Sequence, residues 1–561
     1  MAPAAEGGAT TQTPETVDVI VVGTGMMGLY ALYCLREREM STIAFEAGDG
    51  VGGTWYWNRY PGARCDMESV QYSYNFSKEV RDEWNWTHRY ATQPEILSYL
   101  NHVADRFDLR RDIRFETRVT SAVFDEKTHL WTLETDRGDV ARARYCIMAT
   151  GSLSTPFRPD FPGIEDYQGE WYHGGTWPHH EVDLAGKRVG VIGTGSTGIQ
   201  LTTEIAPVVK HLTVFQRTAN YSTPARNRPL REGELDEFKA NHAEWFREAT
   251  YSHTGITSNP PSTNRSAHDD TPEERQLLFE DRWGIGGQPQ IILAIYNDIN
   301  TDQEANDMVA DFVRQKIREI VDDPDVAELL CPDKGQPIGS KRPPIDSGYF
   351  EMFNLDNVSL VDVRSAPIER ITPTGLCTTD DEYELDVIIF ATGFDALTGA
   401  MLAIDIRGRD GVVLKDIWAE GPQTNLGIMA AGLPNMFMIH GPGSTSVKVN
   451  MFIGGEHQID WIMECIEHLD ANGFVCIETT EEAQADWTAH VQEVANESLQ
   501  PVADSWYVGA NIPGKPRVYM PYFGGFERYW KHCDEIVADG YRGFRLSRSD
   551  SSETNPSVAA E

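Results

Sequence analysis

Residues 17–28 read VDVIVVGTGMMG, and this stretch decides the fold. Its first half is a compact β-branched run, which is typical of a strand buried on both faces. Gly23, Gly25 and Gly28 follow with Gly-x-Gly-x-x-Gly spacing, and a helical pattern then leads into a second apolar run that ends at Glu46. These glycines allow a tight turn, the approach of a pyrophosphate to a helix N-terminus, and close helix–strand packing, while Glu46 can accept hydrogen bonds from a ribose diol. The stretch therefore predicts a dinucleotide-binding unit.

The pattern recurs at 187–201, KRVGVIGTGSTGIQL, with a different residue at the end of its second strand. Arg217, followed by Thr218, occupies the slot that Glu46 fills in the first unit. A carboxylate repels a 2′-phosphate, whereas a guanidinium binds one bidentately, so we expect a free ribose in the first unit and NADPH in the second. The alternative for Arg217 is a surface arginine at a strand end. The candidate nucleotide contacts in the second turn are Gly193, Thr194, Gly195, Ser196, Thr197 and Gly198.

The segment after the first unit indicates which cofactor that unit holds. Residues 51–66, VGGTWYWNRYPGARCD, are rich in glycine and aromatic rings, which suits a large planar group such as FAD. Thr54 and Trp55 are the candidate FAD contacts in this segment. Two dinucleotides in one chain imply electron transfer, with NADPH as the hydride donor to FAD.

Composition excludes several classes of protein. The 561 residues carry a formal net charge of −38, which disfavours nucleic-acid binding. The eight cysteines form no CxxC pair and no zinc-spaced cluster, so we expect no metal site and no redox disulfide. We find neither a signal-peptide pattern nor an apolar run near membrane-spanning length. We therefore expect a cytoplasmic protein that contacts no membrane. We also expect a monomer or a weak homo-oligomer, although nothing in the composition decides the oligomeric state.

The order of the segments predicts an α/β fold with two Rossmann-like dinucleotide-binding domains, each discontinuous, and a helical insertion. CIMATG (146–151) and VIIFATG (387–393) are apolar runs ending in Ala-Thr-Gly, where we expect the chain to pass between domains. Capping-box patterns at 271–274 and 301–304 support the helical insertion. The predicted parts are disordered tails at 1–15 and 549–561, an FAD domain at 16–152 and 386–548, an NADP domain at 153–225 and 335–385, and the insertion at 226–334.

The connector between the two units, YQGEWYHGGTWP (167–178), resembles the fingerprint of type I Baeyer–Villiger monooxygenases. Its matching positions are Tyr167, Gly169, His173, Trp177 and Pro178. Tyr167 stands where the family usually has Phe. Further segments look like this family from about residue 16 to 546, including GGTWYWNRYPGARCDMES, SKRPPIDSGYFEMFN and SWYVGANIPGKPR. Among its members, the phenylacetone and steroid monooxygenases are the nearer ones, and cyclohexanone monooxygenase is more distant.

The resemblance implies that NADPH-reduced FAD reacts with O2 to give a C4a-peroxyflavin, which converts a ketone into an ester or lactone. It assigns charge stabilisation to Arg342, with Asp66 orienting the guanidinium. It places Lys341 at the NADP 2′-phosphate and Trp506 near the nicotinamide. The loop 441–451, GPGSTSVKVNM, resembles the substrate-pocket loop, where this chain differs in detail at Lys448 and Val449. We interpret His173 as a hydrogen-bonded structural residue rather than a proton shuttle.

Two other functions stay open at this point. A flavin-dependent monooxygenase that oxygenates nitrogen or sulfur would share the paired glycine motifs, and so would a non-enzymatic nucleotide sensor or electron carrier. The sequence leaves open which ketone is used, whether linear, cyclic, aromatic or steroidal, and with what selectivity.

Overall fold

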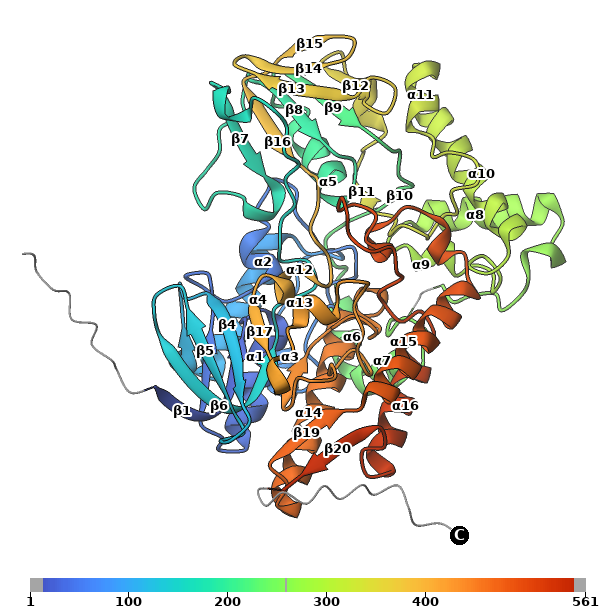
Figure 1. The fold of residues 1–561 in the computed structure, drawn as a ribbon. Coiled ribbons are helices and arrows are strands. Elements are labelled where there is room, and N and C mark those ends of the chain that lie inside the picture. Colours follow the sequence, from blue (N-terminus) through green and yellow to red (C-terminus); the bar gives the residue numbers. More distant parts are fainter. Residues whose placement is uncertain (1–13, 258–259, 549–561) are drawn as a thin grey trace, which may run out of the picture.

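A computed structural model describes residues 14–257 and 260–548 of the chain. The chain forms two units, each built on a sheet that contains one of the glycine-rich turns (Figure 1). This mixed α/β architecture with parallel pairing confirms the predicted fold class. The predicted tails lie largely outside the described residues, although Glu15, the last residue of the N-terminal one, already belongs to the first strand.

The first sheet has eight strands in the order β17-β4-β5-β6-β1-β2-β3, with β18 also pairing with β6. At its centre Val21 pairs in parallel with Ala44 on one side and Ile147 on the other. The strands are β1 (Glu15–Val22), β2 (Thr42–Phe45), β3 (Ile113–Arg114), β4 (Val119–Asp125), β5 (Leu130–Thr135), β6 (Val140–Met148), β17 (Asp405–Arg407) and β18 (Met436–Met438). Strands β4 to β6 form an antiparallel meander that covers one edge of the parallel part.

The second sheet has five strands in the order β12-β9-β8-β16-β7, and every pair is parallel. Its strands are β7 (Glu170–His173), β8 (Arg188–Ile192), β9 (His211–Gln216), β12 (Val358–Asp362) and β16 (Val387–Phe390). In both units a helix begins just after the glycine turn: α1 (Met26–Glu37) in the first and α5 (Ser196–Ile205) in the second. This strand–turn–helix order is the one that the glycine spacing predicts.

The predicted domain boundary at residue 386 is placed too early. Strand β16 pairs with β7 and β8, with Ile389 opposite both Tyr172 and Val191, so it belongs to the second sheet. The chain therefore returns to the first unit only after Phe390. Both β6 and β16 end in an apolar run that Ala-Thr-Gly follows, and such a run does not specify which sheet its strand joins.

The insertion consists of helices that pack against both units (Figure 1). They are α6 (Glu234–Ala240), α7 (His242–Thr250), α8 (Pro272–Ile285), α9 (Gln290–Leu293), α10 (Gln303–Ile320) and α11 (Pro324–Leu330). The predicted capping box of α8 is formed between Thr271 and Glu274. The one predicted at 301–304 is wrong, because Asp302 caps α10 by accepting a hydrogen bond from the backbone N–H of Ala305.

The C-terminal part adds three long helices to the first unit: α14 (Met451–Asn472), α15 (Glu481–Asn496) and α16 (Phe526–Ala538). Helix α14 packs on α1, and the buried residues of both belong to one core. The remaining helices are α2 (Thr54–Trp57), α3 (Lys78–Glu83), α4 (Gln93–Arg106), α12 (Gly399–Leu402) and α13 (Leu414–Ile417). The remaining strands are β10 (Thr223–Pro224), β11 (Ile345–Asp346), β13 (Ile368–Thr372), β14 (Gly375–Thr378), β15 (Glu382–Glu384), β19 (Cys476–Thr479) and β20 (Phe544–Ser547).

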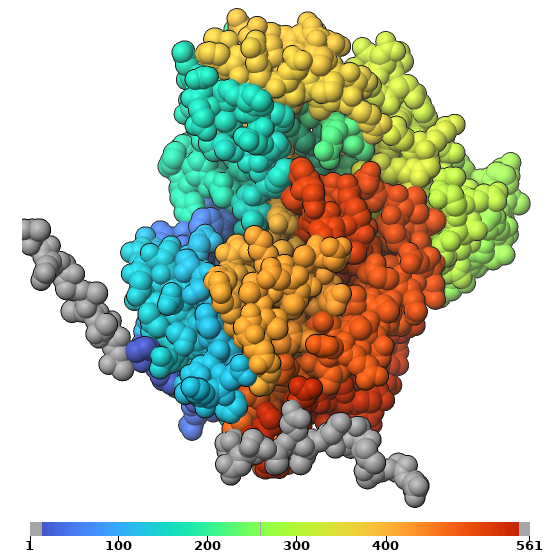
Figure 2. Space-filling view, viewed as in Figure 1, coloured from blue at the N-terminus to red at the C-terminus, as the bar shows by residue number. Residues whose placement is uncertain are grey.

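A hollow opens where the two units meet. Figure 2 shows it between the teal and yellow atoms of the second unit and the red C-terminal segment, with green atoms from the middle of the chain at its floor. Within the described residues no helix is both long and apolar enough to cross a membrane.

Candidate active site

Arg342 and Asp66 form a bidentate ion pair between the two units. The guanidinium donates from Nε to Oδ2 of Asp66 at 2.5 Å and from Nη2 to Oδ1 at 2.8 Å. Its Nη1 donates to the backbone carbonyl of Val447 at 2.8 Å. Arg342 lies in an irregular segment leading into β11, because the two prolines that follow exclude a helix. The fold thus brings together residues that are 276 positions apart.

Both members of this pair remain ionised. Burial raises the pKa of the Asp66 carboxyl, but the charge and hydrogen bonds of Arg342 outweigh burial, and the pKa ends below its ordinary value. Burial likewise opposes the charge on Arg342, and the Asp66 carboxylate outweighs it, so the pKa of the guanidinium lies above its usual range. The result is a fixed positive group that is oriented by a carboxylate and only partly exposed.

Tyr507, in the 3-10 turn Trp506–Val508, stands beside this pair. The Trp506 and Tyr507 rings lie 4.3 Å apart between centroids. Burial raises the pKa of the Tyr507 hydroxyl to about 12, while the nearby charge of Arg342 acts in the opposite direction. Tyr507 was not singled out by the sequence, although its place directly after Trp506 is a signal that could have found it.

Three cations gather at the carboxyl ends of β9 and β12. Burial lowers the pKa of Lys341, and the charges of Arg217 and Arg364 lower it further. The three cations are therefore close enough to interact electrostatically. Arg364 donates to the backbone carbonyl of Arg217 at 3.2 Å and pairs with Asp333 at 2.7 Å. The sequence predicts Arg217 and Lys341 but misses Arg364, which follows a strand that pairs with β9. A cluster of this kind suits a phosphate group.

The two glycine turns have the geometry that a nucleotide requires. A Cβ added at Gly198 would stand 2.1 Å from the carbonyl oxygen of Gly193, and one at Gly28 would stand 2.0 Å from that of Gly23, so both helices pack closely on their turns. A Cβ at Gly195 would meet nothing within 4 Å. The second turn is therefore open at its middle glycine, where a pyrophosphate approaches a helix N-terminus.

Glu46 lies against the first turn. Its Oε2 accepts from the backbone N–H and the hydroxyl of Thr24, both at 2.9 Å, and its Oε1 accepts from the backbone N–H of Gly48 at 2.9 Å. Oε1 keeps a lone pair for a ribose hydroxyl. In the segment that follows, Thr54 is exposed at the start of α2, while Trp55 is buried and donates to the Tyr72 hydroxyl at 3.2 Å.

The second turn also holds the remaining predicted polar residues. Thr194 donates to the backbone carbonyl of Thr218 at 3.0 Å, which ties the turn to the end of β9. Ser196 is exposed at the start of α5. A Cβ at Gly174 would stand 2.5 Å from the Thr197 methyl group, so the connector packs directly against this turn.

The connector 167–178 supplies the edge strand β7 and a tight turn. Tyr167 donates from its hydroxyl to the carbonyl of Leu385 at 3.0 Å, and a Cβ at Gly169 would meet the Tyr167 ring. Trp177 is buried and packs against Tyr172 at 5.3 Å between ring centroids. Pro178 follows it and is half-buried. The connector is thus packed into the second unit.

His173 makes its hydrogen bonds to the backbone. Nδ1 accepts from the backbone N–H of Gly175 at 2.9 Å, and Nε2 lies 3.1 Å from the carbonyl of Phe157. These partners fix a neutral imidazole with the proton on Nε2. Burial lowers the pKa of His173, and the nearby Arg158 charge adds to this. This geometry favours the structural interpretation of His173.

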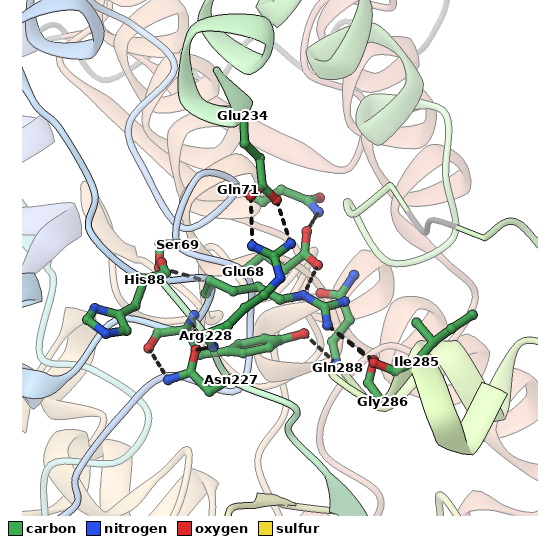
Figure 3. Close-up of polar contacts among 12 residues, drawn as sticks. Glu68, Ser69, Gln71, His88, Asn227, Arg228, Glu234, Ile285, Gly286 and Gln288 are labelled. Carbon is green, nitrogen blue, oxygen red and sulfur yellow. Dashed lines mark hydrogen bonds and ion pairs between the residues drawn. The ribbon is translucent and has the colours of Figure 1, made fainter. Parts of the chain in front are cut away.

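A group of polar contacts, here called the polar seam, anchors the start of the helical insertion and its α8–α9 connection to the loop that follows Asp66 (Figure 3). Arg89 pairs with Glu68 at 2.8 Å, and the side chain of Asn227 both accepts from and donates to the backbone of Tyr90. The Tyr90 hydroxyl accepts from the backbone N–H of Gln288 at 2.8 Å. The insertion therefore holds the loop of Asp66 in place from outside.

Comparisons with known proteins agree with this geometry. Residues 16–224 match the flavin-binding monooxygenase-like family model. The chain is 42% identical over 545 residues to a Baeyer–Villiger monooxygenase of Pseudooceanicola batsensis, covering 96% of this chain and 98% of that protein. It is also 42% identical to a phenazine N-monooxygenase of Lysobacter antibioticus, covering 95% and 98%. An oxidised steroid monooxygenase structure bound to NADP matches with a TM-score of 0.90 and 50% identity, covering 95% of this chain and all of that one.

Proposed function

Because the chain belongs to the Baeyer–Villiger monooxygenase family of flavoproteins, we propose that it binds FAD and NADPH and uses O2 to convert ketones into esters or lactones. The observation that carries this proposal is the Arg342–Asp66 pair at the junction of the two nucleotide units. Flavin enzymes that only pass electrons onward do not need a fixed cation for a substrate oxygen. This pair therefore favours an oxygenase over an electron carrier.

The residues at the two turns fit these cofactors. We assign FAD to the first turn, with Glu46 at its ribose and Thr54 and Trp55 along it. We assign NADPH to the second turn, where the open position at Gly195 admits the pyrophosphate and the cluster of Arg217, Lys341 and Arg364 takes the 2′-phosphate. When bound, the cofactors supply the reducing equivalents that activate O2 for transfer to the substrate.

Arg342 stabilises the negative charge that develops on the substrate's carbonyl oxygen when that carbon is attacked. Three of its N–H groups are engaged by Asp66 and Val447, so its other donors are available to an anionic oxygen. A preorganised donor of this kind contributes about 3–4 kcal/mol to lowering the barrier. Asp66 acts through Arg342 by fixing its orientation. Trp506 and Tyr507 shield the site from water, which strengthens the charge interaction.

Oxygenation of nitrogen is a second candidate function, favoured by the similarity to the phenazine N-monooxygenase. A nitrogen nucleophile has no carbonyl oxygen on which charge develops, so this reaction does not depend on Arg342 in the same way. Removing Arg342 is expected to slow ketone oxygenation by about 10²- to 10³-fold and to spare N-oxygenation.

The test is turnover of a ketone panel by the FAD-loaded protein with NADPH and O2. The panel contains linear, cyclic, aromatic and steroidal ketones, and esters or lactones are identified by gas chromatography with mass spectrometry. We expect ketone-dependent NADPH consumption matched by ester. Stoichiometric hydrogen peroxide with every ketone, and no ester, contradicts the proposal. Phenazine added to the same panel detects the N-oxygenating alternative.

We also propose a cytoplasmic location and a monomeric or weakly associating state. All eight cysteines are free, which suits a reducing compartment. Light scattering coupled to size exclusion at several protein concentrations measures the oligomeric state, and a stable oligomer at low concentration contradicts this part.

A further inference from the structure

Lys448 is a cation placed one residue from a contact of Arg342. It ends the 3-10 turn Ser446–Lys448, and the preceding residue, Val447, accepts the hydrogen bond from the Arg342 guanidinium. As a residue Lys448 is partly buried, and desolvation is the largest influence on the pKa of its amine.

The groups that contact the Lys448 amine directly are uncharged. Its Nζ donates to Oε1 of Gln500 at 2.5 Å and lies 3.7 Å from the centre of the Tyr507 ring and 5.4 Å from that of Phe523. Across residues 14–257 and 260–548, no carboxylate lies within 4.0 Å of this amine. By contrast, two other half-buried cations have partners, because Arg342 pairs with Asp66 and Lys515 with Asp395.

The loop that carries Lys448 is held from two sides. The amide of Asn450 donates to the backbone carbonyl of Gln71 at 2.8 Å, and its backbone N–H donates to the carbonyl of Thr254 in the insertion. Gln71 in turn contacts Glu68, in the seam that anchors the insertion (Figure 3). The position of the amine relative to Arg342 is therefore set by the fold rather than by a free loop.

The Lys448 amine has no negatively charged partner to compensate its charge. Transfer of a cation out of water is unfavourable unless a negative group compensates it. Burial lowers the pKa of Lys448, and the positive charge of Arg342 lowers it further. Asp66 is already committed to Arg342 by two hydrogen bonds. An anionic group on a substrate bound at Arg342 would supply the missing negative charge beside Lys448.

Resting on the proposed function, we propose that Lys448 is a specificity-determining residue that binds a carboxylate on the ketone substrate. The preferred substrates are then keto acids, with the ketone oxygen at Arg342 and the acid at the Lys448 amine. The Gln500 amide oxygen orients the amine, and the rings of Tyr507 and Phe523 flank the chain that links the two ends of the substrate.

The test compares keto acids with their methyl esters, which keep the ketone and lose the charge. The probes are 4-oxopentanoate, 5-oxohexanoate, 6-oxoheptanoate and their methyl esters, used with the FAD-loaded enzyme, NADPH and O2. The readout is the ratio of kcat/KM for each acid to that for its ester, because a general loss of activity affects both. We expect the wild-type ratio to favour at least one acid. Lys448→Met should lower that ratio by about 10- to 100-fold, while Lys448→Arg should largely retain it.

Lys415→Met is the matched control, because it removes the same charge from an exposed lysine on α13. Its ratio should equal that of wild type. Calorimetry measures the binding of each probe to protein loaded with FAD and NADP⁺. It distinguishes a failure of the Lys448 assignment from a failure of the proposed function. Stronger binding of an acid than of its ester that depends on Lys448 supports the assignment even without turnover. Turnover of ketones with equal ratios in wild type and Lys448→Met overturns the Lys448 assignment alone, and equal binding of acids and esters overturns it as well.

Discussion

Removing the Arg342 guanidinium and the Asp66 carboxylate, first singly and then together, tests the mechanism directly. Arg342→Ala deletes the donors that we assign to the substrate oxygen, and loss of one such group typically lowers kcat by about 10²- to 10³-fold. Asp66→Ala leaves the guanidinium in place but frees it from two hydrogen bonds. Because Asp66 acts only through Arg342, we expect the double variant to be no slower than Arg342→Ala.

The same variants should also differ from wild type in their free energy of unfolding. Each single substitution leaves a partly buried charge without its partner, which costs up to about 3–5 kcal/mol. The double variant removes both charges and should be more stable than the sum of the single effects predicts. Ester formation at saturating NADPH measures the rates, and urea unfolding of the FAD-loaded protein measures the stability. Arg370→Ala, an exposed arginine on β13, is the control for loss of a positive charge. Additive losses in kcat, or an Arg342→Ala enzyme within about threefold of wild type, would refute the reasoning.

Three further results are expected. Arg217→Ala should raise KM for NADPH by about 10-fold or more and change KM for NADH little, because only NADPH carries the 2′-phosphate; equal increases exclude this role. Gly195→Ala should fold normally yet weaken NADP⁺ binding, whereas Gly198→Ala should lower the Tm because its Cβ meets a backbone oxygen; the two effects are separated by calorimetry and thermal unfolding. Burial raises the pKa of the Glu456 carboxyl from 4.5 to about 7, against hydrogen bonds from Asn75. The protonated Glu456 therefore stabilises the fold fully below pH 4.5, and this stabilisation is lost as the pH rises through 7. Glu456→Gln should reduce the fall in unfolding free energy over this pH range by up to about 3 kcal/mol, as measured by urea unfolding. Parallel pH profiles of the two proteins would contradict it.

The two nucleotide units were predictable because their signals are local. A β-branched run, three spaced glycines and a helical pattern specify each strand–turn–helix within about 30 residues. The opposite charges of Glu46 and Arg217 at equivalent positions are also local, and the structure places Glu46 against the first turn and Arg217 at the end of β9. For Arg342 and Asp66 the family resemblance was needed, since no pattern in either segment refers to the other.

What the sequence did not predict depends on contacts between distant segments. Arg364 joins the cation cluster because β12 pairs with β9, which is a property of the sheet and not of the residues around Arg364. Val447 holds Arg342 through a backbone carbonyl, a group that every residue has, so its identity carries no signal. The error at residue 386 has the same origin, because β16 is apolar enough to fit either sheet.

The ion pair can form only when the two units are correctly placed relative to each other. Asp66 follows the first turn, and its loop reaches across to the second unit, where the hydroxyl of Tyr60 donates to the side chain of Gln200 on α5 at 2.9 Å. The same Gln200 donates to the backbone carbonyl of Arg64 at 3.1 Å, two residues before Asp66. Helix α5 begins at the second turn, so the helix that contacts the Asp66 loop has its N-terminus at the second glycine turn. The Arg342–Asp66 pair is thereby oriented by elements of both nucleotide units.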